Sequence, residues 1–364
     1  MSNPTRPRVG LAFSGGGFRA AAFGLGAMRA LNDRGILPDV RVVSGISGGS
    51  LLTAMWAYGP ADFAEFDASV NGMLRTNLRN ELFRRAMHPR LIASNARSVV
   101  LALPPRPLKR ARASTRTEAL VSAFAARTFG AKHMDEVTHP GLDTIISATD
   151  LSTGNAVRFG SAVSSCSPHG LIAGPITVAE ATAASAAFPA LLPQLNRTYT
   201  FTRSNGVKHR KTMLMTDGGV YDNLALSPIL PGRSARHTSH VYDLDHVIAV
   251  DAGVGRSPKL APNFMTGRLL RSFEIAHTRS QDGMRALIHE HRSAGRLQGL
   301  TYVYLGMPDN RLPVPVSDLV SHAAVKDYPT DFSPVPTDKL GALTNRAEQL
   351  TRALIDFYCP DLGQ

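Results

Sequence analysis

Short apolar runs alternate along the chain with longer segments in which apolar residues recur at helical spacing. The short runs are bounded by polar residues, glycine or proline, which is typical of buried strands. They predict strands near residues 8–13, 40–44, 143–150, 155–159, 211–216, 246–251 and 300–305. The helical spacing predicts helices near residues 17–34, 49–58, 62–80, 116–128, 177–187, 265–292 and 338–358. This alternation indicates an α/β protein.

The junction between the second strand and the second helix reads Gly45-Ile46-Ser47-Gly48-Gly49. This is a Gly-x-Ser-x-Gly elbow, in which a sharp strand-to-helix turn exposes a serine hydroxyl to a substrate. Gly45 and Gly49 leave space for an ester carbonyl to approach Ser47, and the following helix begins with unpaired N–H groups. The pattern alone would also fit a turn whose small residues only allow close packing.

A glycine loop, Ser14-Gly15-Gly16-Gly17, joins the first strand to the first helix. The amides of Gly15, Gly16 and Gly17 suit an anion, and they could donate to the oxyanion of a tetrahedral intermediate on Ser47. Gly15, Gly17 and Ala20 also satisfy the G-x-G-x-x-A pattern of dinucleotide sites. However, the second strand ends at residue 44 without the carboxylate that a ribose would require, so the oxyanion interpretation is favoured.

A carboxylate follows the strand near residues 211–216, in Asp217-Gly218-Gly219. In open α/β sheets, catalytic groups gather at the carboxyl ends of the strands. On its own, Asp-Gly is also a common turn dipeptide. Asp217 therefore gains weight only in combination with the two preceding motifs.

Taken in order, these motifs resemble those of the patatin-like phospholipase family. Ser14 to Arg19 is similar to its oxyanion loop, residues 45–49 to its elbow, and Asp217 to Gly219 to its D-G-G motif. Ala184 to Pro189, closed by Pro193, resembles its A-S-x-A-x-P block. The resemblance covers about residues 8–255. The chain departs from the family pattern at Ser14, Ala20, Leu192 and Asp222-Asn223. These departures affect the choice of substrate more than the catalytic chemistry.

The resemblance implies a three-layer patatin-like fold, with a mostly parallel central sheet flanked by helices. It implies a single domain over residues 1–364, with a core at about 8–255 and a C-terminal helical part at about 260–364. It also implies a catalytic dyad of Ser47 and Asp217 that needs no cofactor, in a lipid acyl hydrolase of the phospholipase A or lysophospholipase type. Arg19 would contact a substrate phosphate or hold the loop; a helix-surface arginine is the alternative.

A conventional Ser–Asp–His triad remains possible by chain order, but the candidate histidines lie in no recognisable motif. They are His246, His277, His289, His291 and His322. No cluster has the spacing of metal ligands, so we expect no catalytic metal. Two cysteines, Cys166 and Cys359, are too few for a disulfide framework and fit a reducing compartment.

The charge of the chain, +12 at pH 7, is concentrated in one segment. Residues 75–116 contain eleven basic residues and one acid, Glu81, together with apolar residues. We interpret this segment as a basic helical insertion or lid after the nucleophile helix, attracted to an anionic membrane surface. The residues chosen as membrane contacts are Arg84, Arg85, Lys109 and Arg110. A solvated basic surface is the alternative, and no nucleic-acid partner is expected, because few aromatics accompany the charges.

No apolar stretch is suited to span a membrane. Together with the cysteine usage, this predicts a cytoplasmic enzyme that associates peripherally with membranes and acts on phospholipid or another acyl lipid. The alternative is a non-catalytic lipid- or nucleotide-binding protein on the same fold.

Overall fold

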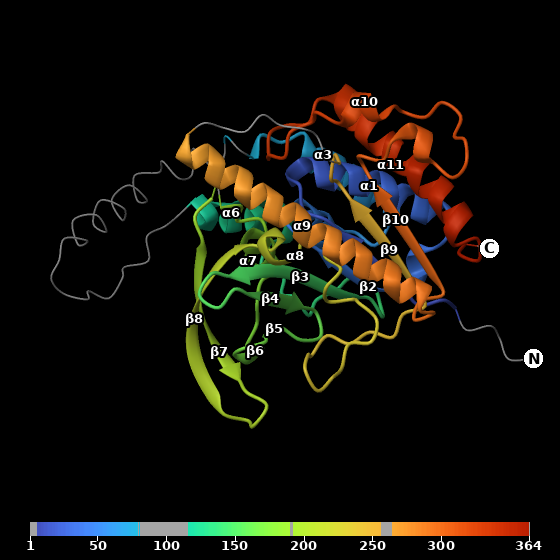
Figure 1. The fold of residues 1–364 in the computed structure, drawn as a ribbon. Coiled ribbons are helices and arrows are strands. Elements are labelled where there is room, and N and C mark those ends of the chain that lie inside the picture. The colour runs from blue at the N-terminus through green and yellow to red at the C-terminus, as the bar shows by residue number, and fades with distance from the viewer. Residues whose placement is uncertain (1–5, 79, 81–115, 190–191, 256–263, 364) are drawn as a thin grey trace, which may run out of the picture.

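The computed structural model describes residues 6–78, 80, 116–189, 192–255 and 264–363. All its strands join one ten-stranded sheet (Figure 1). One half of the sheet contains parallel strands, each paired with the next. In spatial order these are β10 (Gly299–Tyr304), β9 (His246–Asp251), β1 (Val9–Phe13), β2 (Val40–Gly45) and β3 (Asp143–Asp150).

The other half of the sheet is antiparallel. It contains β4 (Asn155–Gly160), β5 (Ser165–Cys166), β6 (Gly170–Ala173), β7 (Leu195–Thr202) and β8 (Lys208–Asp217). β8 also pairs with β3 in antiparallel sense, so this half closes on itself. The prediction of a mostly parallel sheet therefore describes only the half that begins with β10 and ends with β3. The antiparallel half contains three strands that the sequence patterns did not predict, β5, β6 and β7.

Helices cover both faces of the parallel half (Figure 1). On one face α1 (Gly17–Asp33) packs along α11 (Thr337–Tyr358), with α2 (Gly48–Tyr58) and α3 (Phe63–Leu74) beside them. On the other face α9 (Met265–Ser293) crosses the strands as one long helix. The shorter α-helices of the described residues are α6 (Arg116–Phe124), α7 (Val178–Ser185), α8 (Gly219–Asp222) and α10 (His322–Val325).

The strands of the parallel half are buried on both faces. Along β1, Leu11 and Phe13 pack in the larger core beneath α1, whereas Ala12 faces a smaller core beneath α9. This arrangement explains why these strands read as continuous apolar runs rather than as alternating ones. α1 approaches α11 so closely that a Cβ at Gly26 would lie 2.0 Å from the Thr344 carbonyl oxygen. The absence of a side chain at Gly26 therefore lets α1 and α11 pack in close contact on this face.

Most of the basic insertion predicted for residues 75–116 lies outside the described residues, including Arg84, Arg85, Lys109 and Arg110. Within the described ranges, no helix has both the length and the apolar character that a membrane crossing requires.

Candidate active site

The glycine loop and the serine elbow begin side by side, because β1 and β2 are adjacent parallel strands. Phe13, the last residue of β1, is in register with Gly45 of β2. The two turns then pack backbone against backbone: a Cβ at Gly48 would lie 1.8 Å from the Gly17 carbonyl oxygen, and one at Gly49 would lie 2.4 Å from that of Phe13. The glycines of the elbow are therefore required by the neighbouring loop as well as by access to Ser47.

Ser47 has a backbone conformation that L-residues rarely adopt, with φ 52° and ψ −119°. Such a conformation costs about 1–3 kcal/mol and persists only where the surroundings enforce it. Two hydrogen bonds do so here. The Ser47 amide donates to Ser185 Oγ at 3.0 Å, and Ser50 Oγ donates to the Ser47 carbonyl at 2.6 Å. Ser47 as a whole residue is 8% exposed, so it is largely buried.

Asp217 ends β8 opposite Ala148 of β3 and is buried. Its Oδ1 accepts a hydrogen bond from the Gly219 amide at 2.7 Å. Burial raises the pKa of the Asp217 carboxyl to about 6; the Gly219 amide and the Ser47 hydroxyl, which favour the anion, oppose this rise. Oδ2 has no partner of ordinary hydrogen-bond length and angle within the described part of the chain. The Ser47 hydroxyl therefore lies near enough to favour the charged form of this buried carboxyl, although no hydrogen bond of ordinary length and angle joins it to Oδ2.

The three loop glycines differ in the state of their amides. The Gly15 amide donates to the Asn223 carbonyl at 3.0 Å, and the Asn223 side chain occupies the space of a Gly15 Cβ. Gly16 and Gly17 have φ of +143° and +57°, and neither amide has a protein acceptor among the described residues. Among the described residues, the Gly16 and Gly17 amides are therefore the ones of this trio left without a protein acceptor, and an oxyanion hole made by all three glycines stays a prediction.

A C-terminal segment holds the glycine loop from outside. The Phe18 amide donates to the Asp331 carbonyl at 2.9 Å, and a Cβ at Gly17 would lie 2.6 Å from the same oxygen. Arg19 Nη1 donates to the Tyr328 carbonyl at 2.8 Å. Arg19 is buried rather than on the helix surface, and burial lowers the pKa of its guanidinium to about 10. Its observed contact is one that fixes the segment against the loop.

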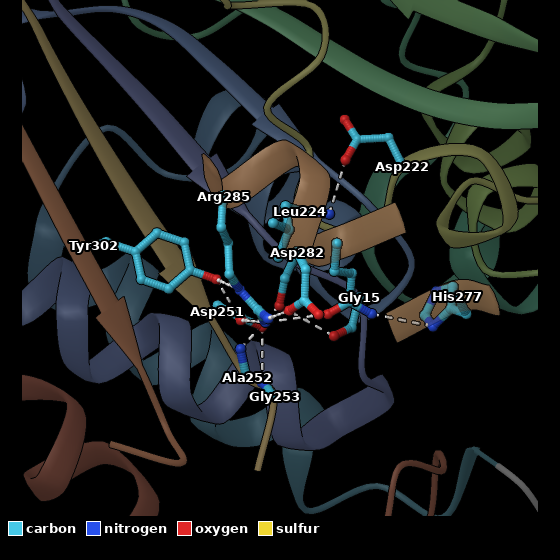
Figure 2. A network of polar contacts seen from close by, with 12 residues as sticks. Gly15, Asp222, Leu224, Asp251, Ala252, Gly253, His277, Asp282, Arg285 and Tyr302 are labelled. Carbon is cyan, nitrogen blue, oxygen red and sulfur yellow. Dashed lines mark hydrogen bonds and ion pairs between the residues drawn. The ribbon is translucent and has the colours of Figure 1, made fainter. Parts of the chain in front are cut away.

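A polar network from α9 reaches the same region (Figure 2). Asp251, at the end of β9, accepts hydrogen bonds from Arg285 Nη2 at 2.7 Å and from the Tyr302 hydroxyl at 2.6 Å. Gln281 links Arg285 to His277, and His277 Nε2 lies 2.9 Å from the Gly219 carbonyl oxygen. A neutral imidazole protonated at Nε2 satisfies both His277 contacts, in agreement with a pKa that burial lowers. The network ties α9 to the turn that carries Asp217.

The sequence patterns did not predict this network. His277, Gln281 and Arg285 recur every four residues and so share one face of a helix, which is the signal that could have identified them. Within the described residues, no histidine side chain hydrogen-bonds to Ser47 or Asp217. His246, His289, His291 and His322, the other histidines considered for a triad, also make no such contact. In the same part of the chain, no three His, Cys, Asp or Glu side chains form a cluster that could hold a metal ion.

Comparisons with known proteins give both a family and a fold. The family model described as patatin-like phospholipase matches residues 11–230. No curated protein matches the chain significantly in sequence. Among solved structures, human GIVD cytosolic phospholipase A2 is 12% identical with a TM-score of 0.58; the match covers 96% of this chain and 59% of that one. The chain thus corresponds to little more than half of the human enzyme's length.

Two bacterial proteins are similar at lower TM-scores. VipD from Legionella pneumophila is 15% identical with a TM-score of 0.40, and the match covers 97% of this chain and 67% of that one. The type III effector protein ExoU is 15% identical with a TM-score of 0.37, with 96% and 53% covered.

Proposed function

The chain belongs to the patatin-like phospholipase family, and on that premise we propose that it is a lipid acyl hydrolase that cleaves carboxylic esters of phospholipids or related lipids. In this proposal Ser47 is the nucleophile and Asp217 the base, in an enzyme of the phospholipase A or lysophospholipase type. The observation that carries the proposal is that Ser185 joins the two turns: its Oγ accepts the Ser47 amide at 3.0 Å, and its carbonyl accepts the amide of Gly218, next to Asp217, at 3.2 Å. The partners would be an acyl lipid and the anionic surface that contains it.

In the first half-reaction, Asp217 accepts the Ser47 proton while Oγ attacks the ester carbonyl carbon. The carbonyl oxygen becomes an oxyanion, to which the Gly16 and Gly17 amides donate hydrogen bonds. The tetrahedral intermediate then expels the alcohol, which takes the proton from Asp217 as the ester C–O bond breaks. The acyl group remains on Ser47 Oγ.

In the second half-reaction, Asp217 accepts a proton from water, and the resulting hydroxide oxygen attacks the acyl carbon. Collapse of this intermediate returns the proton to Ser47 Oγ and releases the fatty acid. The raised pKa of Asp217 supports this role, since a carboxylate with a pKa near 6 is a better base than one near 4. The absence of a histidine contact among the described residues supports a dyad over a triad.

The pH dependence of activity provides a test of Asp217 as the base. Asp217 must be deprotonated in the free enzyme, so kcat/KM should rise with pH and reach half its plateau near pH 6, within about one unit. The assay is hydrolysis of a water-soluble ester over pH 4 to 8, which avoids changes in vesicle charge. A neutral plateau that persists below pH 4.5 would contradict the assignment.

The function itself is tested by incubating the protein with vesicles of mixed phospholipids and measuring released fatty acid. We expect release by the wild type that stops when Ser47 is replaced. Lipid binding without hydrolysis, under conditions in which the protein is folded, would instead favour a non-catalytic lipid-binding role.

A further inference from the structure

The N-terminal half of α9 exposes large apolar side chains. Four of them, Phe264, Met265, Leu269 and Leu270, are between 57% and 68% exposed. We call these residues, together with Phe273 and Ile275, the α9 patch; the last two are also exposed. Large apolar side chains that are exposed together on one short segment mark an interaction site more often than scattered single side chains do.

The α9 patch is continuous with the candidate active site. Phe273 stacks on His277 with ring centroids 5.7 Å apart, and His277 Nε2 contacts the Gly219 carbonyl. Gly219 in turn donates its amide to Asp217. In Figure 1 the N-terminal end of α9 reaches the upper left edge of the described part of the molecule.

The charges beside the patch are mainly positive. Between residues 264 and 279 the helix carries Arg268, Arg271 and Arg279 against one acid, Glu274. Glu274 is paired with Arg271 at 3.0 Å. An amphipathic helix with large apolar side chains and flanking arginines is complementary to an anionic bilayer, which accepts the apolar side chains and attracts the cations.

We propose that the α9 patch is the surface by which the protein docks on an anionic lipid bilayer, on the helix that contacts its candidate active site through His277. The proposal rests on the proposed function, and it names the partner that this site requires. Docking places the apolar side chains below the lipid headgroups and the arginines at the headgroup level. Phe273 and His277 then lie between the bilayer and the turn that carries Asp217.

The test compares two leucine pairs in a Ser47→Ala background, which keeps the vesicles intact. Leu269→Gln with Leu270→Gln alters the patch. Leu151→Gln with Leu287→Gln is the matched control, because both leucines are exposed but lie outside the patch. Co-sedimentation with vesicles of phosphatidylcholine and phosphatidylglycerol gives the partition coefficient. The patch pair should weaken binding by about tenfold or more, since each glutamine removes apolar area that the leucine would bury in the bilayer. The control pair should weaken binding by less than about twofold.

Two further readouts separate the alternatives. When the same two double substitutions are made in the protein that keeps Ser47, both variants should hydrolyse a soluble short-chain ester at the same rate. Loss of vesicle binding by the patch variant with unchanged ester hydrolysis supports docking. If the wild type hydrolyses no ester yet the patch pair still loses binding, the proposed function fails and the docking surface stands. Equal vesicle binding by the two pairs overturns the proposal. So does a wild-type dimer that only the patch pair converts to monomers, with binding unchanged, because the patch would then join two copies.

Discussion

Replacing Ser47 with alanine is expected to lower kcat/KM for ester hydrolysis by at least about 10⁴-fold, because no other group can take the acyl chain. The fold should be retained. Alanine keeps the Cβ in the same strained backbone, and the two hydrogen bonds that enforce φ 52° use main-chain atoms of residue 47. The thermal midpoint should therefore change by no more than a few degrees. Both quantities come from purified protein, by steady-state kinetics and by circular dichroism.

Ser44 is the matched control for this substitution. It lies on β2, the strand that leads into the elbow, it is buried, and its hydroxyl has no hydrogen-bond partner in the described structure. Ser44→Ala should therefore keep activity within about twofold of wild type, since no hydrogen bond is lost. If Ser47→Ala retained more than a tenth of wild-type activity, Ser47 would not be the nucleophile.

Replacing Asp217 with asparagine is expected to lower kcat/KM by about 10³-fold or more, since the amide cannot accept the Ser47 proton. The same substitution should raise the free energy of unfolding, although it lowers activity. The pKa of Asp217 in the native protein, about 6, lies above the ordinary value of 3.8 for an aspartate. Ionising the buried carboxyl therefore destabilises the native protein as pH rises through this interval, and the cost is complete above pH 6. It amounts to about 3 kcal/mol at most.

Asparagine removes this cost while its Oδ1 can still accept the Gly219 amide. The variant should therefore unfold at higher denaturant concentration than the wild type at pH 8, and the advantage should disappear near pH 4, where both side chains are neutral. Denaturant unfolding at the two pH values measures this difference. If the variant were instead less stable than the wild type at pH 8, and this deficit disappeared at pH 4, the native protein would stabilise the charged carboxylate. That result would contradict the raised pKa assigned to Asp217.

The sequence predicted the strands that carry the site because their local signals agree. β1, β2 and β8 combine apolar runs with glycine-rich ends, and the structure places these elements where the patterns predicted them. The hairpin from β7 to β8 was half missed, although Asn205-Gly206 at its turn, with Gly206 at φ +81°, is a known hairpin signal. β5 and β6 are too short for any periodicity to reveal.

Which of the loop amides has a hydrogen-bond acceptor could not be predicted from the sequence, for a different reason. Gly15, Gly16 and Gly17 look alike in the chain, and only the approach of Asn223 from a distant turn distinguishes the first from the others. Likewise Arg19 could be read as a surface residue until the Tyr328 segment was seen to cover it. Contacts between segments so far apart in sequence follow from tertiary packing rather than from local pattern.

The pairing of one activated serine with one carboxylate is tested most directly by covalent labelling with an alkyl fluorophosphonate, which phosphonylates only a nucleophilic hydroxyl and releases fluoride. Mass spectrometry of the intact chain and of its peptides locates the adduct. The account predicts a single adduct on Ser47 in the wild type, none in Ser47→Ala, and labelling of Asp217→Asn that is slower by about the same factor as its loss of hydrolysis. An adduct on a different serine, or equal labelling rates for the wild type and Asp217→Asn, would contradict it.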